Sequence, residues 1–278
     1  MKYLISLIIV VAAVALVACA GQNQEENQVK ETKALVLYYS QNGTTKAVAE
    51  EIQRLTGADI EAIVVEEPYS GNFQETIERV QKERQDSVLP KLAALKSNLD
   101  DYDVIYLGYP IWFGTYAPPM AAFVKNTSLE GKKVVPFCSF GSGGLEVSIR
   151  DLQAAQPKAE FAAGYGVRTA RIAAMPAEVD RFLKENGYIE GEVEPLPEYS
   201  AQQPVTAEET AIFNAACSAY EYPLGTPVTC GKRETATSTD YNFGVKSQAP
   251  DGSEIPATIF VTVAKAENAT PEFTRVAR

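Results

Sequence analysis

The sequence predicts an α/β fold, in which a five-stranded parallel, doubly wound sheet is followed by a small C-terminal α+β domain. Between residues 33 and 189, five β-prone runs alternate with helical runs, which is the order of parallel sheets with right-handed crossovers. One of these runs, Ile60–Val65, is rich in β-branched residues and predicts a strand buried on both faces. After residue 205 the pattern changes to one helix followed by β-prone runs.

The elements of the first domain follow in order. Pro118 suits the first turn of a helix, and Gly187 ends the last helix of the domain. The five predicted strands are Leu35–Tyr39, Ile60–Val65, Asp103–Gly108, Lys133–Cys138 and Phe161–Val167. The predicted helices are Thr44–Leu55, a long charged helix within Gly71–Asn98 that is interrupted near Pro90, Pro118–Val124, Leu145–Ala155 and Ala177–Asn186.

Composition narrows the classes of function. The formal net charge of -11 argues against nucleic acid as a partner, because phosphate backbones repel an acidic surface. The chain contains no histidine, which excludes Ser-His-Asp and Cys-His catalysis and removes the commonest zinc ligand. Any chemistry must therefore come from a cofactor, a carboxylate, Tyr, Lys or Cys; we predict no catalytic residue and no metal site.

The N-terminus resembles a bacterial lipoprotein signal. Residues 1–18 carry one lysine and then an apolar run, which is short for a membrane span and suits a signal peptide. The run ends in Leu16-Val-Ala-Cys19, a sequence similar to the lipobox, in which the cysteine becomes the lipidated first residue. The alternative is a plain signal peptide with an incidental cysteine. Residues 19–32 are rich in Gln, Glu and Asn and predict a flexible tether.

Three loops after predicted strands are expected to meet at one edge of the sheet, where doubly wound folds bind ligands. The first, Ser40–Thr45, precedes a helix, whose unpaired N–H groups and dipole favour an anion. Ser40, Asn42 and both threonines add donors, and Gly43 tolerates a positive φ. The loop matches neither the nucleoside triphosphate fingerprint nor the dinucleotide fingerprint, so a monophosphate is the better prediction.

The second and third loops suit a flat ring. Tyr109–Tyr116 holds Trp112, the only tryptophan, together with other aromatic residues, and predicts a platform for a flat ligand. The alternative is that Trp112 only fills the helix–sheet interface. Ser139–Gly144 is rich in small residues, so its backbone can approach a ring edge and donate N–H groups. Its alternative is an ordinary strand-to-helix turn.

With these three loops in this order, residues 33–189 resemble a flavodoxin, specifically the branch with Tyr-Pro-Ile-Trp-x-Gly in the second loop. The resemblance implies a flavodoxin-like fold and non-covalent FMN. It departs from the family in two places: Asn42 stands where many flavodoxins have Thr, and the third loop lacks the Tyr that stacks on the flavin in the best-known members. The cofactor-binding residues that the resemblance implies are Ser40, Gln41, Asn42, Gly43, Thr44, Thr45, Pro110, Ile111, Trp112, Phe113, Gly114, Ser139, Phe140, Gly141, Ser142, Gly143 and Gly144.

The C-terminal segment resembles no family that we recognise. Residues 190–204 predict a linker, and 205–278 a helix on a small antiparallel sheet. The predicted helix is Thr210–Tyr220, and the predicted strands are Thr226–Cys230, Thr239–Val245 and Thr258–Ala264. Thr206 and Glu209 form a capping box before the helix, and Asp251-Gly252 predicts a hairpin turn. In an exported protein Cys217 and Cys230 can form a disulfide; the alternative is a free, buried pair.

The sequence thus leads us to expect an FMN-binding lipoprotein that transfers electrons in the cell envelope. Its expected partners are redox proteins there and a membrane reached through the lipid on Cys19, with the outer membrane favoured. One alternative is an FMN-dependent reductase of quinones that uses NADH or NADPH. Another is a flavodoxin scaffold that has lost its flavin and serves as a binding module.

Overall fold

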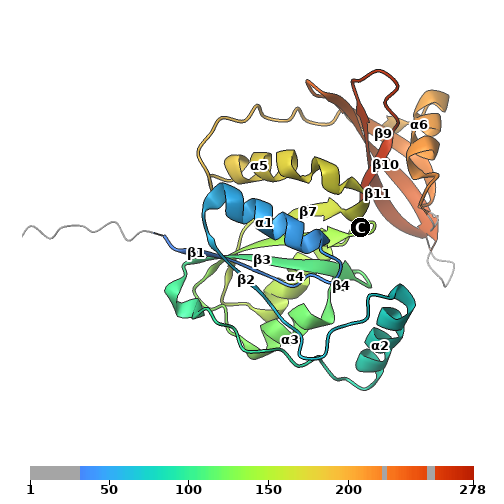
Figure 1. Ribbon diagram of the computed structural model, residues 1–278. Coiled ribbons are helices and arrows are strands. Elements are labelled where there is room, and N and C mark those ends of the chain that lie inside the picture. The colour runs from blue at the N-terminus through green and yellow to red at the C-terminus, as the bar shows by residue number, and fades with distance from the viewer. Residues whose placement is uncertain (1–31, 221–223, 249–253) are drawn as a thin grey trace, which may run out of the picture. The chain divides into compact units, whose positions relative to one another are not determined.

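A parallel sheet with the strand order β2-β1-β3-β5 forms the centre of the first domain, and its far edge consists of β6 and β7 (Figure 1). The computed structural model describes residues 32–220, 224–248 and 254–278. β6 pairs with the start of β5 and β7 with its end, so the fifth predicted strand exists in two pieces. The predicted five-stranded, doubly wound sheet is confirmed. The strands are β1 (Ala34–Tyr38), β2 (Asp59–Ala62), β3 (Val104–Trp112), β4 (Thr115–Tyr116), β5 (Lys133–Phe140), β6 (Glu160–Phe161) and β7 (Tyr165–Arg168).

Helices cover both faces of this sheet (Figure 1). On one face, Val36 packs among residues of α1 and α5 such as Ile52 and Val179. On the other face, Leu37 packs among residues of α3 and α4 such as Phe123 and Leu152. Alternate residues of β1 are therefore buried on opposite faces. The helices are α1 (Thr44–Thr56), α2 (Phe73–Gln85), α3 (Pro118–Asn126), α4 (Leu145–Ala155) and α5 (Met175–Glu185).

The second strand lies at the edge of the sheet, so the prediction that Ile60–Val65 is buried on both faces was wrong. β2 ends at Ala62, and its residues are only partly buried or exposed. Ile63 and Val65 are then buried, whereas Val64 is 53% exposed. The apolar run reflects a short edge strand and a buried connection that follows it.

The predicted long helix within Gly71–Asn98 was also too long. α2 ends at Gln85, and the short 3-10 helix Leu99–Asp101 is the next helical element. Ser87 has a positive φ of 55°, and Pro90 disfavours helical geometry in the residue before it. Leu92 then forms an isolated antiparallel bridge with Val65. Its apolar side chain packs against the core without helical structure.

The third strand continues past its predicted end at Gly108 and reaches Trp112. It then turns back at once into β4, which pairs antiparallel with it. Phe113 and Gly114 form the turn and both have positive φ, 52° and 87°. Two central residues with positive φ are the mark of a type I′ hairpin turn. The predicted aromatic loop is therefore a tight hairpin, which fixes the backbone around Trp112.

We predict that Gly108→Ala destabilises this sheet. A Cβ at Gly108 would lie 2.1 Å from the ring of Phe137, which is fully buried on the neighbouring strand. Overpacking of this kind costs about 1–3 kcal/mol, and urea unfolding would measure it. Gly71→Ala is the matched control, because a Cβ there meets nothing within 4 Å. Equal stability of the two variants would contradict the close approach.

The C-terminal segment is a helix on an antiparallel sheet of order β12-β11-β10-β9-β8, as predicted. Phe213 of the helix packs edge-on against Phe243 of the sheet, with ring centroids 5.3 Å apart. The capping box of Thr206 and Glu209 is present. Strands β8 and β12 were not predicted, and the predicted Asp251-Gly252 turn lies outside the described residues. The elements are α6 (Ala207–Cys217), β8 (Gln203–Pro204), β9 (Thr226–Glu234), β10 (Ser238–Gln248), β11 (Glu254–Ala264) and β12 (Glu272–Ala277).

The cysteines of the described residues are free thiols. Cys217 and Cys230 are unbonded, Cys230 buried and Cys217 partly buried. Burial raises the pKa of Cys217 to about 11 and that of Cys230 to about 12. Burial also raises the pKa of Cys138, which lies in the core at the end of β5. Because the thiolate is the reactive form, these three cysteines are poor nucleophiles at neutral pH.

Residues 32–278 form one compact unit. Residues 1–31, with the predicted signal peptide, Cys19 and nearly all of the tether, lie outside the described residues. None of the helices in the described part of the chain has the length and apolarity to cross a membrane.

Candidate flavin-binding cleft

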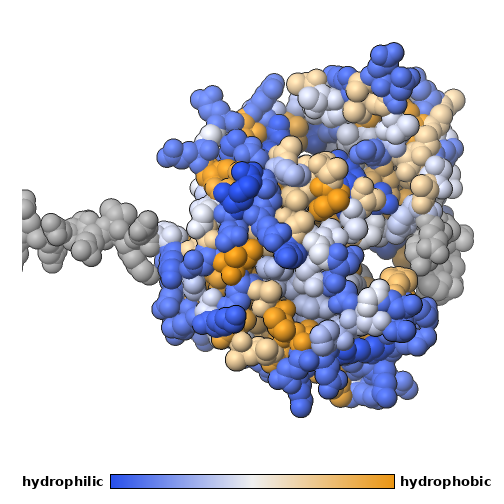
Figure 2. Space-filling view, viewed as in Figure 1, coloured by the Kyte–Doolittle hydropathy of each residue, from blue (hydrophilic) through white to orange (hydrophobic). Residues whose placement is uncertain are grey.

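A cleft with a volume of about 1050 Å³ lies at the carboxyl edge of the sheet, where the three predicted loops converge. Figure 2 shows mostly hydrophilic side chains on this face and a hollow between the region of α2 and the C-terminal sheet. Such an edge, between β1 and β3, is the switch point of a doubly wound sheet. The predicted site residues that line the cleft are Gln41, Asn42, Pro110, Ile111, Trp112, Phe113, Gly114, Ser139, Phe140, Gly141, Ser142, Gly143 and Gly144.

The first loop holds a polar atom that has no partner. The Oγ atom of Ser40 is buried and makes no hydrogen bond within the described part of the chain. It precedes α1, whose N-cap is Gly43 with a φ of 88° and without a side chain to cap the helix. The first turn of α1, which the structure describes in full, contains no acidic residue. A buried hydroxyl beside an uncapped helix start suits an anion that accepts hydrogen bonds.

The other polar residues of the first loop make hydrogen bonds that hold the loop in place. Thr45 is buried, and its hydroxyl lies 2.8 Å from that of Ser139, which joins the first and third loops. Asn42 accepts a hydrogen bond from the N–H of Thr44 through Oδ1, at 3.3 Å. Ser40, Gly43, Thr44 and Thr45 do not line the cleft wall itself. Lys46 pairs with Glu50 in solvent, as expected of a solvated first-turn lysine.

Gln41 connects the first loop to α2. Its side-chain amide donates to the carbonyls of Tyr69 and Ser70, at 3.2 and 2.7 Å, and its oxygen accepts from the hydroxyl of Tyr39. Its predicted role in the phosphate loop is therefore one of positioning, because these contacts occupy the side chain. They also hold Ser70 and the start of α2 against the cleft.

Trp112 both packs against the core and lines the cleft. Its ring makes edge-to-face contacts with Tyr69 and Tyr39, with centroids 5.2 and 6.1 Å apart. These contacts fix the plane of the indole, which remains only partly buried. The two interpretations of Trp112, platform and plug, are thus compatible. Phe113, at the tip of the hairpin, is 49% exposed and lies under the guanidinium of Arg84.

The second and third loops touch through a glycine. Gly144 has a φ of 114°, and a Cβ there would lie 2.8 Å from Ile111. Only glycine combines this backbone geometry with so close an approach. Gly144 is also the N-cap of α4, so a second uncapped helix start borders the cleft. The sequence predicted a loop of small residues here, and the close packing explains the need for them.

The C-terminal sheet reaches the third loop. The N–H of Val276, in β12, donates to the carbonyl of Ser142 at 2.7 Å, and Val276 forms a parallel bridge with Gly143. Arg168 donates to the carbonyls of Gly141 and Phe273, at 2.7 and 2.8 Å. One wall of the cleft is therefore formed in part by the C-terminal segment, for which sequence analysis predicted no role.

Sequence analysis did not predict twelve of the residues that line the cleft. Those at the start of α2 follow an edge strand and contain no glycine cluster, while those on α4 lie beyond the third loop in an ordinary amphipathic pattern. The N-cap Asn72, which accepts from the N–H of Glu75, was the available signal for the position of α2. The missed residues are Ser70, Gly71, Phe73, Thr76, Ile77, Thr115, Glu146, Val147, Asp151, Thr169, Val276 and Arg278.

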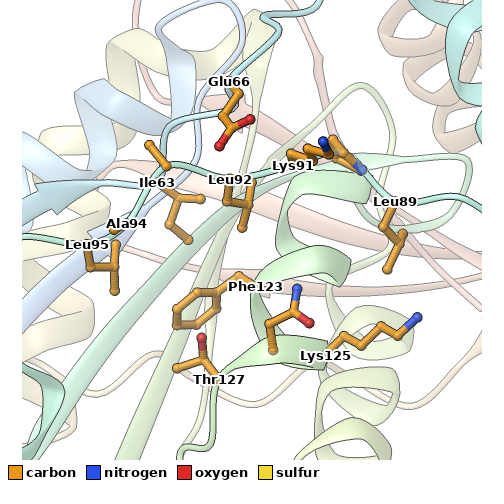
Figure 3. Close-up of a pocket in the computed structure, with 13 residues that line it drawn as sticks. Ile63, Glu66, Leu89, Lys91, Leu92, Ala94, Leu95, Phe123, Lys125 and Thr127 are labelled. Carbon is orange, nitrogen blue, oxygen red and sulfur yellow. The ribbon is translucent and has the colours of Figure 1, made fainter.

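A second cavity, of about 550 Å³, shares no lining residue with the cleft. In Figure 3 the side chains of Ile63, Leu92 and Phe123 surround it, and Lys91 and Lys125 lie at its margin. It lies between α3 and the irregular segment that replaces the predicted long helix. We assign it no part in the chemistry, because no helix start among the described residues borders it as α1 and α4 border the cleft.

Comparisons with known proteins give a family and several similar structures. Residues 33–174 match the model of a protein family described as Flavodoxin. A putative flavoprotein from Bacteroides eggerthii is 30% identical, with a TM-score of 0.47, and the match covers 54% of this chain and 97% of that one. A putative flavoprotein from Bacteroides uniformis is 26% identical, with a TM-score of 0.48, and the match covers 54% of this chain and 99% of that one.

A flavoprotein from Lactobacillus acidophilus, solved in complex with FMN, is 21% identical with a TM-score of 0.43. The match covers 49% of this chain and 93% of that one. Comparison with curated proteins gives no match.

Proposed function

Since the match over residues 33–174 shows that the chain belongs to the flavodoxin family, we propose that the cleft binds FMN and that the protein carries electrons in the cell envelope. The family supports FMN as the cofactor, since flavodoxins bind it at this switch point. The observation that carries the proposal is the buried, unpartnered Oγ of Ser40 beside the uncapped start of α1.

The residues present fit FMN. Ser40 and the N–H groups at the start of α1 would hold its phosphate, and Trp112 would cover one face of its ring. The glycines of the third loop allow the backbone to approach the ring edge. When bound, FMN supplies the electron-transfer chemistry, while the protein binds, orients and shields it.

The polar side chains of the cleft favour a carrier over an enzyme. Among the described residues that line it, the titratable side chains are Glu146, Asp151 and Arg278. Glu146 pairs with Arg275, and Asp151 accepts a hydrogen bond from Thr115. Both carboxylates are thus engaged, which disfavours a role as acid or base toward a substrate. The transfer of single electrons requires neither an acid nor a base from the protein.

One observation favours an FMN-dependent reductase as the second candidate. The cleft, at about 1050 Å³, slightly exceeds the range of about 300–1,000 Å³ that is common for a single small ligand. That volume leaves room for a second molecule beside the ring, such as a quinone. The exposed ring of Phe73 on α2, 75% accessible, would line its entry.

Purification of the chain from residue 20 onward tests these functions in turn. A yellow protein, or a colourless one that takes up added FMN stoichiometrically, supports flavin binding. Failure of both would leave the flavin-free binding module. Anaerobic addition of NADH or NADPH then separates the other two, because a carrier loses its colour slowly or not at all. Rapid bleaching by either nucleotide would favour the reductase.

The location is proposed from the sequence, since Cys19 lies outside the described residues. We predict that Cys19→Ser moves the protein from the membrane fraction to the soluble fraction of cells, because a thioether-linked lipid anchor requires the thiol. Immunoblots of the two fractions measure it, with Cys217→Ser as the matched control that should stay with the membrane. Soluble wild-type protein would contradict the anchor.

A further inference from the structure

The free edge of the C-terminal sheet lies against the third loop of the cleft. β12 is the last strand of its sheet and pairs with β11 on one side only. On its other side, the N–H of Val276 donates to the carbonyl of Ser142. Figure 1 shows the C-terminal end of the chain beside β7, from which Arg168 extends. An unpaired strand edge is thus used to bind the loop.

The approach is close enough to require glycine. A Cβ at Gly143 would lie 2.3 Å from the carbonyl oxygen of Val276. Arg168 strengthens the same contact, because its guanidinium donates to Gly141 in the loop and to Phe273 in β12. The guanidinium also lies over the ring of Phe273, 4.3 Å from its centroid. One side chain therefore joins the loop to the strand.

This contact fixes the direction of one backbone donor. The carbonyl of Ser142 points toward β12, where Val276 donates to it. In a trans peptide the C=O and the following N–H point in opposite directions. The N–H of Gly143 therefore points away from β12, and Gly143 lines the cleft.

We propose that the C-terminal sheet is part of the flavin site: β12 and Arg168 hold the third loop in the shape in which the N–H of Gly143 faces the flavin ring. The inference depends on FMN binding, as proposed above. Arg168 acts as a positioning residue, since it contacts the loop and does not line the cleft. A fixed N–H donor stabilises negative charge on the reduced ring, so docking of the sheet raises both affinity and potential.

The test compares Arg168→Met with Arg181→Met. Like Arg168, Arg181 donates to a backbone carbonyl, that of Glu194; it donates in addition to the carboxylate of Glu185, and neither partner belongs to the loop. We expect Arg168→Met to raise the Kd for FMN roughly tenfold, within the common range of coupling between sites, and to make the potential more negative. Arg181→Met should change neither.

Arg168→Lys keeps the charge but cannot donate to both carbonyls in the geometry of a guanidinium, so it should show the same effects in weaker form. It replaces Arg168→Met in the test if that variant fails to fold. A reciprocal measurement needs no variant: FMN should slow hydrogen exchange at the amide of Val276 in the wild type. Unchanged Kd and potential in Arg168→Met and Arg168→Lys, or unchanged exchange at Val276, would overturn the inference while FMN binding stood. A wild type that binds no FMN would overturn the proposed function itself.

Discussion

Trp112→Ala is expected to weaken FMN binding roughly 30- to 150-fold. An aromatic stack contributes about 0.5–1.5 kcal/mol beyond the burial of its area, and burial of a large apolar side chain contributes about 1.5 kcal/mol or more. The indole is held for such a stack by the edges of Tyr39 and Tyr69. Fluorescence titration of the apoprotein with FMN measures the loss.

The same variant should make the reduction potential less negative. Water would replace the apolar indole beside the ring, and negative charge on the reduced ring is better solvated by water than by an apolar face. Trp112→Phe is the matched control, because it keeps a flat ring on β3 and should retain most of the affinity. Alanine and phenylalanine variants with the wild-type Kd and potential would remove Trp112 from the site.

Much of the cleft could be predicted because parallel strands present their ends at one edge. That geometry brought together loops separated by about a hundred residues, and thirteen of the seventeen predicted binding residues line the cleft. The four that do not, Ser40, Gly43, Thr44 and Thr45, lie in the loop beneath it and at the helix start. Sequence locates a loop well, whereas it does not show which members of the loop line the cleft wall and which lie at the helix start.

The two errors in the predicted elements have different physical causes. An apolar run such as Ile60–Val65 is compatible with a central strand or with an edge strand and a buried connection, and only tertiary packing separates the two. The segment after α2 has a helical composition, but the helix does not continue into it, because Ser87 has a positive φ and Pro90 disfavours helical geometry before it. In the first case tertiary packing decided the structure, and in the second a local break in the helix decided it.

Contacts across the two parts of the chain were beyond sequence reasoning. Nothing in Val276 or Arg168 alone indicates that they meet at the third loop, since their side chains are those of an ordinary strand end. The signal was indirect: a run with three glycines, at 141, 143 and 144, is more than a simple turn requires. Gly143 and Gly144 are each explained by an approach shorter than a Cβ permits.

Ser40→Ala should separate phosphate binding from folding. The hydroxyl is buried without a partner in the described structure, so its removal should leave the stability of the apoprotein unchanged or slightly higher. A hydrogen bond to a charged group contributes about 1.5–3 kcal/mol, so the Kd for FMN should rise roughly 10- to 150-fold. The affinity for riboflavin, which lacks the phosphate, should stay the same.

Thr45→Val is the control for Ser40→Ala, because it should lower stability without a selective loss of FMN affinity. The hydroxyl of Thr45 is already paired with Ser139, so its loss leaves a buried group unsatisfied and should lower stability by about 1–3 kcal/mol. Its effect on FMN and riboflavin should be similar, because it acts through the shape of both loops. Equal losses of FMN and riboflavin affinity in Ser40→Ala would mean that this hydroxyl does not bind phosphate, and the helix start of α1 alone would then have to account for the anion.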